Sequence, residues 1–163
     1  MKVAVVTGAA RGIGLAISKK FLEEGYRIAI LDIDQKTLSQ TMKQDFDTNN
    51  VLGLECDVSE PDQVDQSVNR VVDHFGRIDV LVNNAGIAEF KPMLETTYEE
   101  WSRILAVNLN GPFICSQACA PFMLKNEGGS IVNIASISGL RASTLRIAYG
   151  TSKAALMHLT KQQ

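Results

Sequence analysis

The chain contains 163 residues, and its 16 Lys or Arg against 18 Asp or Glu give a formal net charge of −2 at pH 7. That length suits one domain with a substantial core, and the near balance of charges offers no electrostatic basis for binding nucleic acid or an anionic membrane. We therefore expect the partner to be a small molecule.

The cysteines, histidines and apolar segments indicate where in the cell the protein is expected and whether it binds a metal. Cys56, Cys115 and Cys119 form neither a C-x-x-C pair nor an even-numbered framework, so we expect reduced thiols packed in the core of a cytoplasmic protein. The apolar segment at the N-terminus is too short for a signal peptide, and no run is long enough to span a membrane. No metal site is expected, because His74 and His158 have no acidic or cysteine neighbour at ligand spacing.

Short β-branched apolar segments alternate with segments of helical periodicity, which is typical of a parallel sheet whose strands are joined by helices. We expect strands at residues 2–7, 27–31, 51–55, 80–82 and 130–134, and helices at 12–24, 35–46, 61–75, 98–124 and from 148 onward. Gly111-Pro112 should kink or break the long fourth helix. With right-handed crossovers, these elements make a doubly wound α/β sheet with helices on both faces. No linker or repeat divides residues 1–163, so one domain is expected.

The segment after the first strand, residues 7–14, reads Thr-Gly-Ala-Ala-Arg-Gly-Ile-Gly and opens the first helix. Backbone N–H groups and the helix dipole favour a phosphate there, and glycines permit its close approach. The spacing G-x-x-x-G-x-G differs from G-x-G-x-x-G, so it predicts a related dinucleotide-binding loop made by Gly8, Arg11, Gly12, Ile13 and Gly14. The alternative is a tight turn whose glycines only let the helix pack on the strand.

Asp32 closes the second predicted strand, eighteen residues after Gly14. A carboxylate in that position can accept hydrogen bonds from an adenosine ribose and repel a 2′-phosphate, which favours NAD over NADP. Arg11 leaves NADP open, because its guanidinium could pair with a 2′-phosphate, although it could equally face solvent or the pyrophosphate.

Two further polar segments follow predicted strands, Cys56-Asp57-Val58 after the third and Asn83-Asn84-Ala85-Gly86 after the fourth. Open α/β sheets bind their ligands at the carboxyl ends of the strands, so both segments are candidates for a binding site. The alternative is ordinary turn chemistry, since Asn, Asp and Gly are the residues that turns use.

Tyr149 and Lys153 are four residues apart in the last predicted helix, a spacing that places them on one face. A cation beside a phenol favours the phenolate, by about 4 kcal/mol at an effective dielectric near 20 but only about 1 kcal/mol in bulk water. The pair is therefore useful only in a partly desolvated cleft, and from the spacing alone a surface pair is the alternative. Arg141 and Arg146 could meet an anionic substrate, but exposed positions are expected for both.

Taken together and in order, these residues resemble those of the short-chain dehydrogenase/reductase family. The shared positions are Thr7, Gly8, Gly12, Gly14, Asp57, Val58, Asn83 to Gly86, Asn108, Asn133 to Ser136, Tyr149 and Lys153. The thirteen residues from Ser136 to Tyr149 also fit the family. The resemblance implies a Rossmann-type fold and an NAD(P)-dependent oxidoreductase that moves a hydride between the nicotinamide and an alcohol or carbonyl carbon. A homodimer or homotetramer is implied in the same way.

The resemblance also implies roles for individual residues. Ser136 would hydrogen-bond the substrate oxygen, Tyr149 would take or return the hydroxyl proton, and Lys153 would assist Tyr149 and hold the nicotinamide ribose. Asn108 would keep a water in a relay behind the lysine, although an ordinary helix-interior Asn that bonds backbone near the kink is the alternative. In the cofactor site, the adenine ring would meet Asp57 and Val58, and the adenosine ribose region would meet Asn83.

Members of the family continue past this last helix into further strands. We therefore expect a fragment that lacks the last strands, with the fifth strand at an edge and an apolar face exposed, and with little or no turnover of its own. The alternative is a naturally short chain that covers this edge by self-association. The rival function is a catalytically silent nucleotide-binding or interaction module. The intact set of Ser136, Tyr149 and Lys153 argues against that rival.

Overall fold

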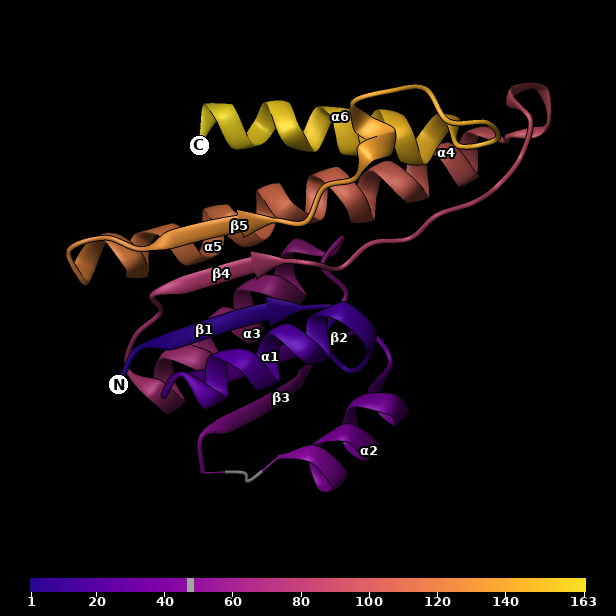
Figure 1. The fold of residues 1–163 in the computed structure, drawn as a ribbon. Helices are drawn as coiled ribbons and strands as arrows, with labels where there is room; N and C mark the ends of the chain where they lie inside the picture. Colours follow the sequence, from indigo (N-terminus) through magenta and orange to yellow (C-terminus); the bar gives the residue numbers. More distant parts are fainter. Residues whose placement is uncertain (47–48) are drawn as a thin grey trace.

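A computed structural model describes residues 1–46 and 49–163. Five parallel strands form one sheet in the order β3-β2-β1-β4-β5, with helices on both of its faces (Figure 1). The strands are β1 Val3–Thr7, β2 Arg27–Asp32, β3 Val51–Glu55, β4 Val80–Asn83 and β5 Ser130–Asn133. The helices are α1 Gly12–Glu23, α2 Gln35–Asp45, α3 Pro61–Phe75, α4 Tyr98–Leu105, α5 Gly111–Lys125 and α6 Ile147–Gln162. Shorter helical segments are η1 Met93–Glu95, η2 Ala106–Asn110 and η3 Ile137–Gly139. The predicted doubly wound α/β fold is confirmed.

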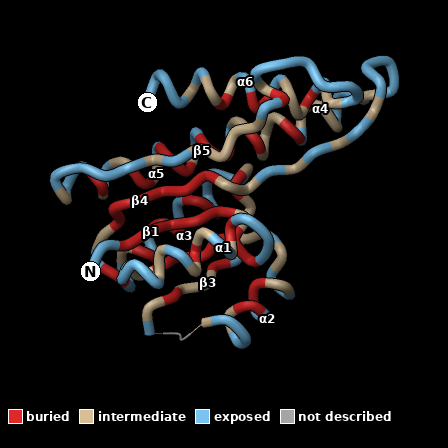
Figure 2. The backbone as a smooth tube through the Cα atoms, viewed as in Figure 1, coloured by how far each residue is buried: buried red, intermediate tan, exposed pale blue. Residues whose placement is uncertain are grey.

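Two hydrophobic cores lie on opposite faces of the sheet, because successive side chains of a strand point to opposite faces. In β1, Val3 and Val5 join α3 and α5 in one core, whereas Ala4 and Val6 join α1 and α2 in the other. The central strands β1 and β4 are buried along their length (Figure 2). Apolar residues on both faces explain why these strands read as continuous apolar runs in the sequence.

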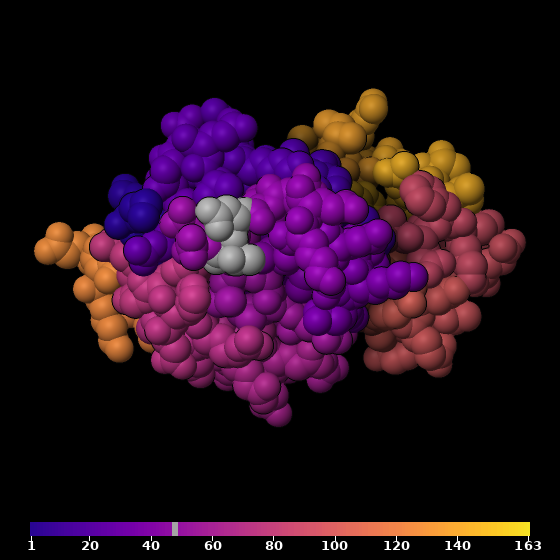
Figure 3. Space-filling model, turned by 90° about the horizontal axis from the view of Figure 1, so that it is seen from below, coloured from indigo at the N-terminus to yellow at the C-terminus, as the bar shows by residue number. Residues whose placement is uncertain are grey.

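The fifth strand lies at an edge of the sheet, as predicted. β5 pairs with β4 alone, and Val132 near its end is 45% exposed. β3 forms the opposite edge, and viewed from that side the first half of the chain covers the centre of the surface, with the C-terminal segment at its margin (Figure 3). α6 packs against α4, η2 and β5.

The predicted long fourth helix is interrupted just before Gly111-Pro112, by a π-helical segment and not by a break at these two residues. The five residues before Gly111 form the π-helical segment η2, and Gly111 itself has helical dihedral angles. A Cβ on Gly111 would lie 2.8 Å from Cγ2 of Val58, so the glycine permits close packing of α5 on the loop after β3. The wider π turn carries Asn108, which is fully buried, and such turns are frequent at functional sites.

The register of β1 against β4 is held by a buried carboxylate below the strands. Oδ2 of Asp79 accepts a hydrogen bond from the backbone N–H of Val3 at 2.8 Å, and the Arg77 guanidinium donates to both oxygens, at 2.5 and 2.9 Å. Burial opposes ionisation of Asp79, but the bonds from Arg77 and Val3 prevail and hold its pKa below the usual 3.8. The carboxylate therefore stabilises the fold at neutral pH.

Replacing Asp79 with Ala should lower the free energy of unfolding by about 2 to 3 kcal/mol at pH 7, since it leaves the buried Val3 N–H unpaired. Arg77→Gln, at a side chain 39% exposed, is the control and should cost about 1 kcal/mol or less. Because the folded-state pKa of Asp79 is lowered, its contribution is present above the unfolded-state value and disappears as pH falls through the folded-state value. Urea unfolding at pH 7 and pH 3 measures both effects, and equal losses in the two variants would contradict this account.

Candidate functional site

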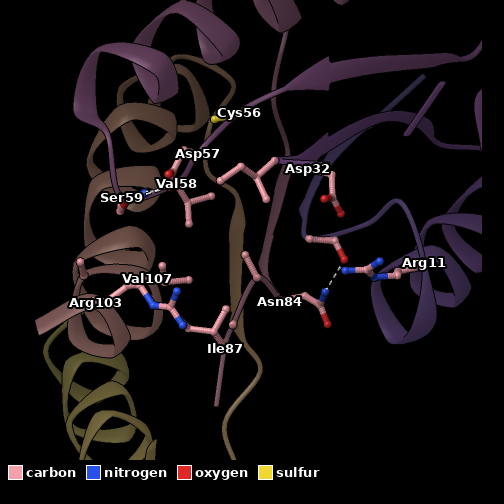
Figure 4. A pocket seen from close by; sticks show the side chains of 15 residues that line it. Arg11, Asp32, Cys56, Asp57, Val58, Ser59, Asn84, Ile87, Arg103 and Val107 are labelled. Carbon is pink, nitrogen blue, oxygen red and sulfur yellow. Dashed lines mark hydrogen bonds between the residues drawn. The ribbon is translucent and has the colours of Figure 1, made fainter. Parts of the chain in front are cut away.

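A cavity of about 390 Å³ lies where the carboxyl ends of β1, β2, β3 and β4 meet α4 and η2 (Figure 4). Loops from four neighbouring parallel strands contribute to its wall, which is where open α/β sheets bind ligands. The residues that line it are Gly8, Arg11, Asp32, Ile33, Cys56, Asp57, Val58, Ser59, Asn84, Ala85, Gly86, Ile87, Arg103, Ala106 and Val107.

The loop after β1 is tied to the loop after β4 by a set of hydrogen bonds. Nδ2 of Asn84 donates to the carbonyls of Thr7 and Gly8, each at 2.9 Å. In return, Oγ1 of Thr7 accepts from the backbone N–H of Asn84 at 3.1 Å and of Ala85 at 3.0 Å. Gly8 has a φ of +61°, and a Cβ on Gly14 would lie 2.4 Å from the Gly8 carbonyl oxygen. Only glycines fit this close approach.

The start of α1 is open to a ligand. No side chain caps its N-terminus, so the first N–H groups of the helix are free of a side-chain acceptor and can receive a phosphate. Of the residues predicted for this loop, Gly8 and Arg11 line the cavity. Gly12 and Ile13 are exposed beside it, and Gly14 is buried behind it.

Asp32 is fixed at the cavity wall by backbone donors. Its Oδ2 accepts from the N–H of Ala10 and its Oδ1 from the N–H of Asp34, both at 3.0 Å. The side chain of Arg11 is 75% exposed, and its guanidinium lies 3.5 Å from the carboxylate of Asp34. The structure thus presents a carboxylate at the end of β2 and turns the nearby cation toward a second acidic residue.

Asp57 and Val58, two of the residues predicted for the cofactor site, both line the cavity. Asp57 is held in a local turn by Ser59, whose N–H and hydroxyl both donate to its Oδ1. Asn83 does not line the cavity. It is 2% exposed, and its Nδ2 donates to Oδ1 of Asn133 at 2.8 Å, on the α5 and β5 side of β4. The contact of Asn83 with the adenosine ribose region stays a prediction, and it is the neighbouring Asn84 that lines the cavity.

Lys153 and Asn108 lie together behind the loop after β4. Lys153 is 4% exposed, its Nζ donates to the carbonyl of Ile134 at 2.7 Å, and burial lowers its pKa. Asn108 bonds the backbone of Ile87 twice, accepting from its N–H at 2.8 Å and donating to its carbonyl at 2.9 Å. A Cβ on Gly86 would lie 3.4 Å from Oδ1 of Asn108 and 3.6 Å from Nζ of Lys153. The cavity wall at Ile87 is thus bonded directly to Asn108, and Lys153 lies close behind Gly86.

Tyr149 lies on the exposed side of Lys153. The Lys153 ammonium is 5.9 Å from the centroid of the Tyr149 ring, and within the described residues the Tyr149 hydroxyl makes no hydrogen bond. Ser136 follows β5, and its Oγ accepts from the N–H of Ser138 at 3.2 Å. A half-buried phenol with an uncommitted hydroxyl beside a buried cation is suited to proton transfer.

The three cysteines are buried and unpaired, as predicted. Burial raises the pKa of Cys115 well above its usual value and that of Cys119 to about 12, so these thiols pack in the core instead of reacting. Among the residues that the structure describes, no group of three or more His, Cys, Asp or Glu is arranged to hold a metal ion. No described helix combines the length and apolarity that crossing a membrane requires.

Comparison with known proteins identifies similar chains. The short chain dehydrogenase family matches residues 2–163. An uncharacterized oxidoreductase of Thermotoga maritima is 39% identical over 98% of this chain and 62% of its own length. The 2-(R)-hydroxypropyl-CoM dehydrogenase of Xanthobacter autotrophicus is 42% identical over 98% of this chain and 66% of its own length. A crystal structure of NAD⁺-bound xylitol dehydrogenase superposes with a TM-score of 0.91 at 36% identity, over 99% of this chain and 63% of that one. The chain thus spans less than two thirds of these proteins.

Proposed function

The chain belongs to the short-chain dehydrogenase family, and from this premise we propose that it uses NAD to oxidise a secondary alcohol or reduce the corresponding ketone. An NAD(P)-dependent oxidoreductase is the general class to which its relatives belong. The observation that carries the finer proposal is the place of the catalytic candidates next to the cavity wall, since Asn108 is hydrogen-bonded to Ile87, which lines the cavity, and Lys153 lies close behind Gly86.

The residues present fit a dinucleotide. The uncapped start of α1 can receive the pyrophosphate, and Gly8 and Gly14 let the loop in front of this helix pack closely on itself and on the loop after β4. Asp32 can accept hydrogen bonds from the adenosine ribose, and Val58 with Val107 offers apolar contacts to the adenine ring. When bound there, the cofactor would supply the hydride acceptor or donor.

The chain's own side chains would then handle the proton and orient the substrate. Tyr149 would take the hydroxyl proton in oxidation or return it in reduction, as general base or acid. Ser136 would hydrogen-bond the substrate oxygen and stabilise the charge that develops on it. Lys153, whose ammonium lies 5.9 Å from the centroid of the Tyr149 ring, would assist Tyr149 and, by family likeness, hold the nicotinamide ribose. Asn108 would hold Ile87 in place and, by family likeness, a water behind Lys153.

Alcohol-dependent formation of NADH by the purified chain tests this proposal, with absorbance at 340 nm as the readout and a panel of secondary alcohols as substrates. Turnover would support the dehydrogenase. Because little turnover is expected from these 163 residues alone, the same assay is run on a chain extended to the full length of its relatives, and NADH binding with no turnover of any alcohol or ketone in both would favour the rival function, a catalytically silent nucleotide-binding module. The absence of NADH binding would contradict both.

Asp32 should set the preference for NAD. Asp32→Ala and Asp32→Asn should each shift the ratio of NAD to NADP affinity toward NADP by roughly tenfold or more, because a negative charge no longer repels the 2′-phosphate. Asn keeps one acceptor oxygen for the N–H groups of Ala10 and Asp34. The Asn variant therefore distinguishes the effect of losing the charge from the effect of disordering the loop. Fluorescence titration with NADH and NADPH measures the ratio. An unchanged ratio in both variants would assign the selectivity elsewhere.

We further propose that residues 1–163 act as one nucleotide-binding domain and assemble as a homodimer or homotetramer in the cytoplasm. Exposed apolar side chains on α5, Phe113 at 50% and Leu124 at 77%, support assembly through that helix. The substrate does not follow from the relatives, whose names include a hydroxypropyl-CoM dehydrogenase, a D-threitol dehydrogenase and a 3-oxoacyl-[acyl-carrier-protein] reductase.

A further inference from the structure

A second cavity, of about 470 Å³, lies beside the start of α6. Its wall comes from the segment at Lys91 and Met93, the loop at residues 138–146 and the first two turns of α6. Two of these segments are joined by backbone pairing, in which the N–H of Lys91 donates to the carbonyl of Leu145 at 3.0 Å and Lys91 forms a parallel bridge with Arg146. The wall is therefore built on paired backbone.

The lining of this cavity is cationic. Lys91, Arg141 and Arg146 contribute to it, and no Asp or Glu does. Lys91 is partly neutralised, because Glu100 pairs with it and Glu95 also acts on its charge, whereas Glu89 pairs with Arg103. Within the described part of the chain, neither Arg141 nor Arg146 forms an ion pair. Two arginines therefore line the cavity without an acidic ion-pair partner among the described residues.

Arg146 connects this cavity to the catalytic candidates. Its guanidinium carbon lies 4.5 Å from the centroid of the Phe90 ring and 5.8 Å from that of Tyr149. Arginine stacked on aromatic rings in this way has its planar fork of N–H donors oriented in advance. Hydroxyl groups add further donors, because Ser138, Ser143 and Thr151 line the same cavity and the first two are hydrogen-bonded at 3.2 Å.

A guanidinium fork matches the oxygens of carboxylate, phosphate and sulfonate groups and can bind them through two parallel hydrogen bonds. We infer that this cavity binds an anionic group of the substrate, held by Arg146 and Arg141, while the carbinol or carbonyl carbon lies at Tyr149. The substrate class is thus a short secondary alcohol or ketone that carries a carboxylate, phosphate or sulfonate. The anion site is a property of the cavity, and only its link to the reacting carbon rests on the proposed function.

Equilibrium binding tests the inference independently of turnover. The chain is titrated by NMR with 3-hydroxybutyrate, 2-hydroxypropyl phosphate and 2-hydroxypropane sulfonate, and with the neutral methyl ester of 3-hydroxybutyrate. The wild type should bind at least one anionic probe about tenfold more tightly than the ester, and the order among the three identifies the anion. Arg146→Gln and Arg141→Gln should each reduce that preference about 10-fold.

Two further variants make the result specific. Arg146→Lys keeps the charge and should retain part of the preference, whereas Arg70→Gln removes an equal charge from the exposed face of α3 and should leave it unchanged. If Arg146→Gln fails to fold by circular dichroism, Arg141→Gln in its exposed loop decides. A wild type that binds the ester as tightly as every anion, or glutamine variants with an unchanged preference, would overturn the inference.

The same probes, offered as substrates with NAD, distinguish the two proposals. Anion preference without turnover, both in this chain and in a chain extended to the full length of its relatives, would retain the site and reject the dehydrogenase reaction. Turnover of the neutral ester at the same kcat/KM as the anions would retain the reaction and reject the site.

Discussion

Substitution of Tyr149 by Phe should lower NAD-dependent turnover by about 10³-fold, within the range of rate factors that general acid or base catalysis contributes. The change removes one hydroxyl group that makes no hydrogen bond within the described residues and leaves the ring that packs beside Lys153 and Arg146. The free energy of unfolding and the affinity for NADH should therefore remain close to those of the wild type. The rate of NADH formation and a fluorescence titration with NADH measure the two quantities.

Tyr26→Phe is the matched control for this experiment. It deletes the same hydroxyl from a tyrosine whose ring packs against Phe21 at 5.0 Å, before β2 and away from the site. The control should retain wild-type turnover. If Tyr149→Phe kept its activity as well, the proton would have to be transferred by another group, and the role proposed for Tyr149 would be rejected.

Substitution of Gly14 by Ala should weaken NADH binding by more than about 100-fold, which corresponds to about 2.7 kcal/mol. The new Cβ would lie 2.4 Å from the Gly8 carbonyl oxygen, 2.6 Å from Nδ2 of Asn84 and 2.8 Å from Cα of Ala9. Two of these atoms belong to backbone, so the phosphate loop itself has to move. Alanine gains about 1 kcal/mol in helix propensity over glycine, but overpacking of this kind costs about 1 to 3 kcal/mol or more, so the clash should win.

Gly12→Ala is the control in the same loop. Nothing lies within 4 Å of a Cβ at Gly12, although its φ of +58° makes alanine cost about 1 to 2 kcal/mol of conformational energy. Its NADH affinity should fall less than that of Gly14→Ala. NADH titration and thermal unfolding of both variants give the comparison. Wild-type affinity in Gly14→Ala would contradict the proposed place of the pyrophosphate at the start of α1.

Asn83 and Asn84 illustrate where sequence reasoning about the site ends. Both lie at the carboxyl end of β4, so the pattern predicts that this segment borders a ligand, and three of its residues, Asn84, Ala85 and Gly86, line the cavity. Successive residues there point in different directions. Asn83 turns to Asn133 of β5, whereas Asn84 clamps the loop after β1. The distinction depends on which element packs on each side, which a pair of identical residues in sequence cannot show.

The partners of Asn108, Asp79 and Arg146 were beyond sequence reasoning for a related reason. The resemblance assigns Asn108 to a relay, and the structure adds that its side chain makes two hydrogen bonds to the backbone of Ile87, 21 positions away. Asp79 holds Val3, 76 positions away in the chain. Arg146 was expected at the surface, and its place over the rings of Phe90 and Tyr149 follows from pairing between two loops.

Local patterns along the chain were enough to predict the alternation of strands and helices, the parallel sheet and the placement of the glycine-rich loop, Tyr149 and Lys153. These features depend on local physics, namely periodicity, glycine at tight turns and the spacing of residues on one helix face. Three features could be recognised only in the folded structure, namely which side chains reach the cavity, the π turn before Gly111 and the basic residues that line the second cavity beside Tyr149. Those properties arise from contacts between segments distant in the chain. Close packing between such segments decides which way a side chain points, and the local sequence does not.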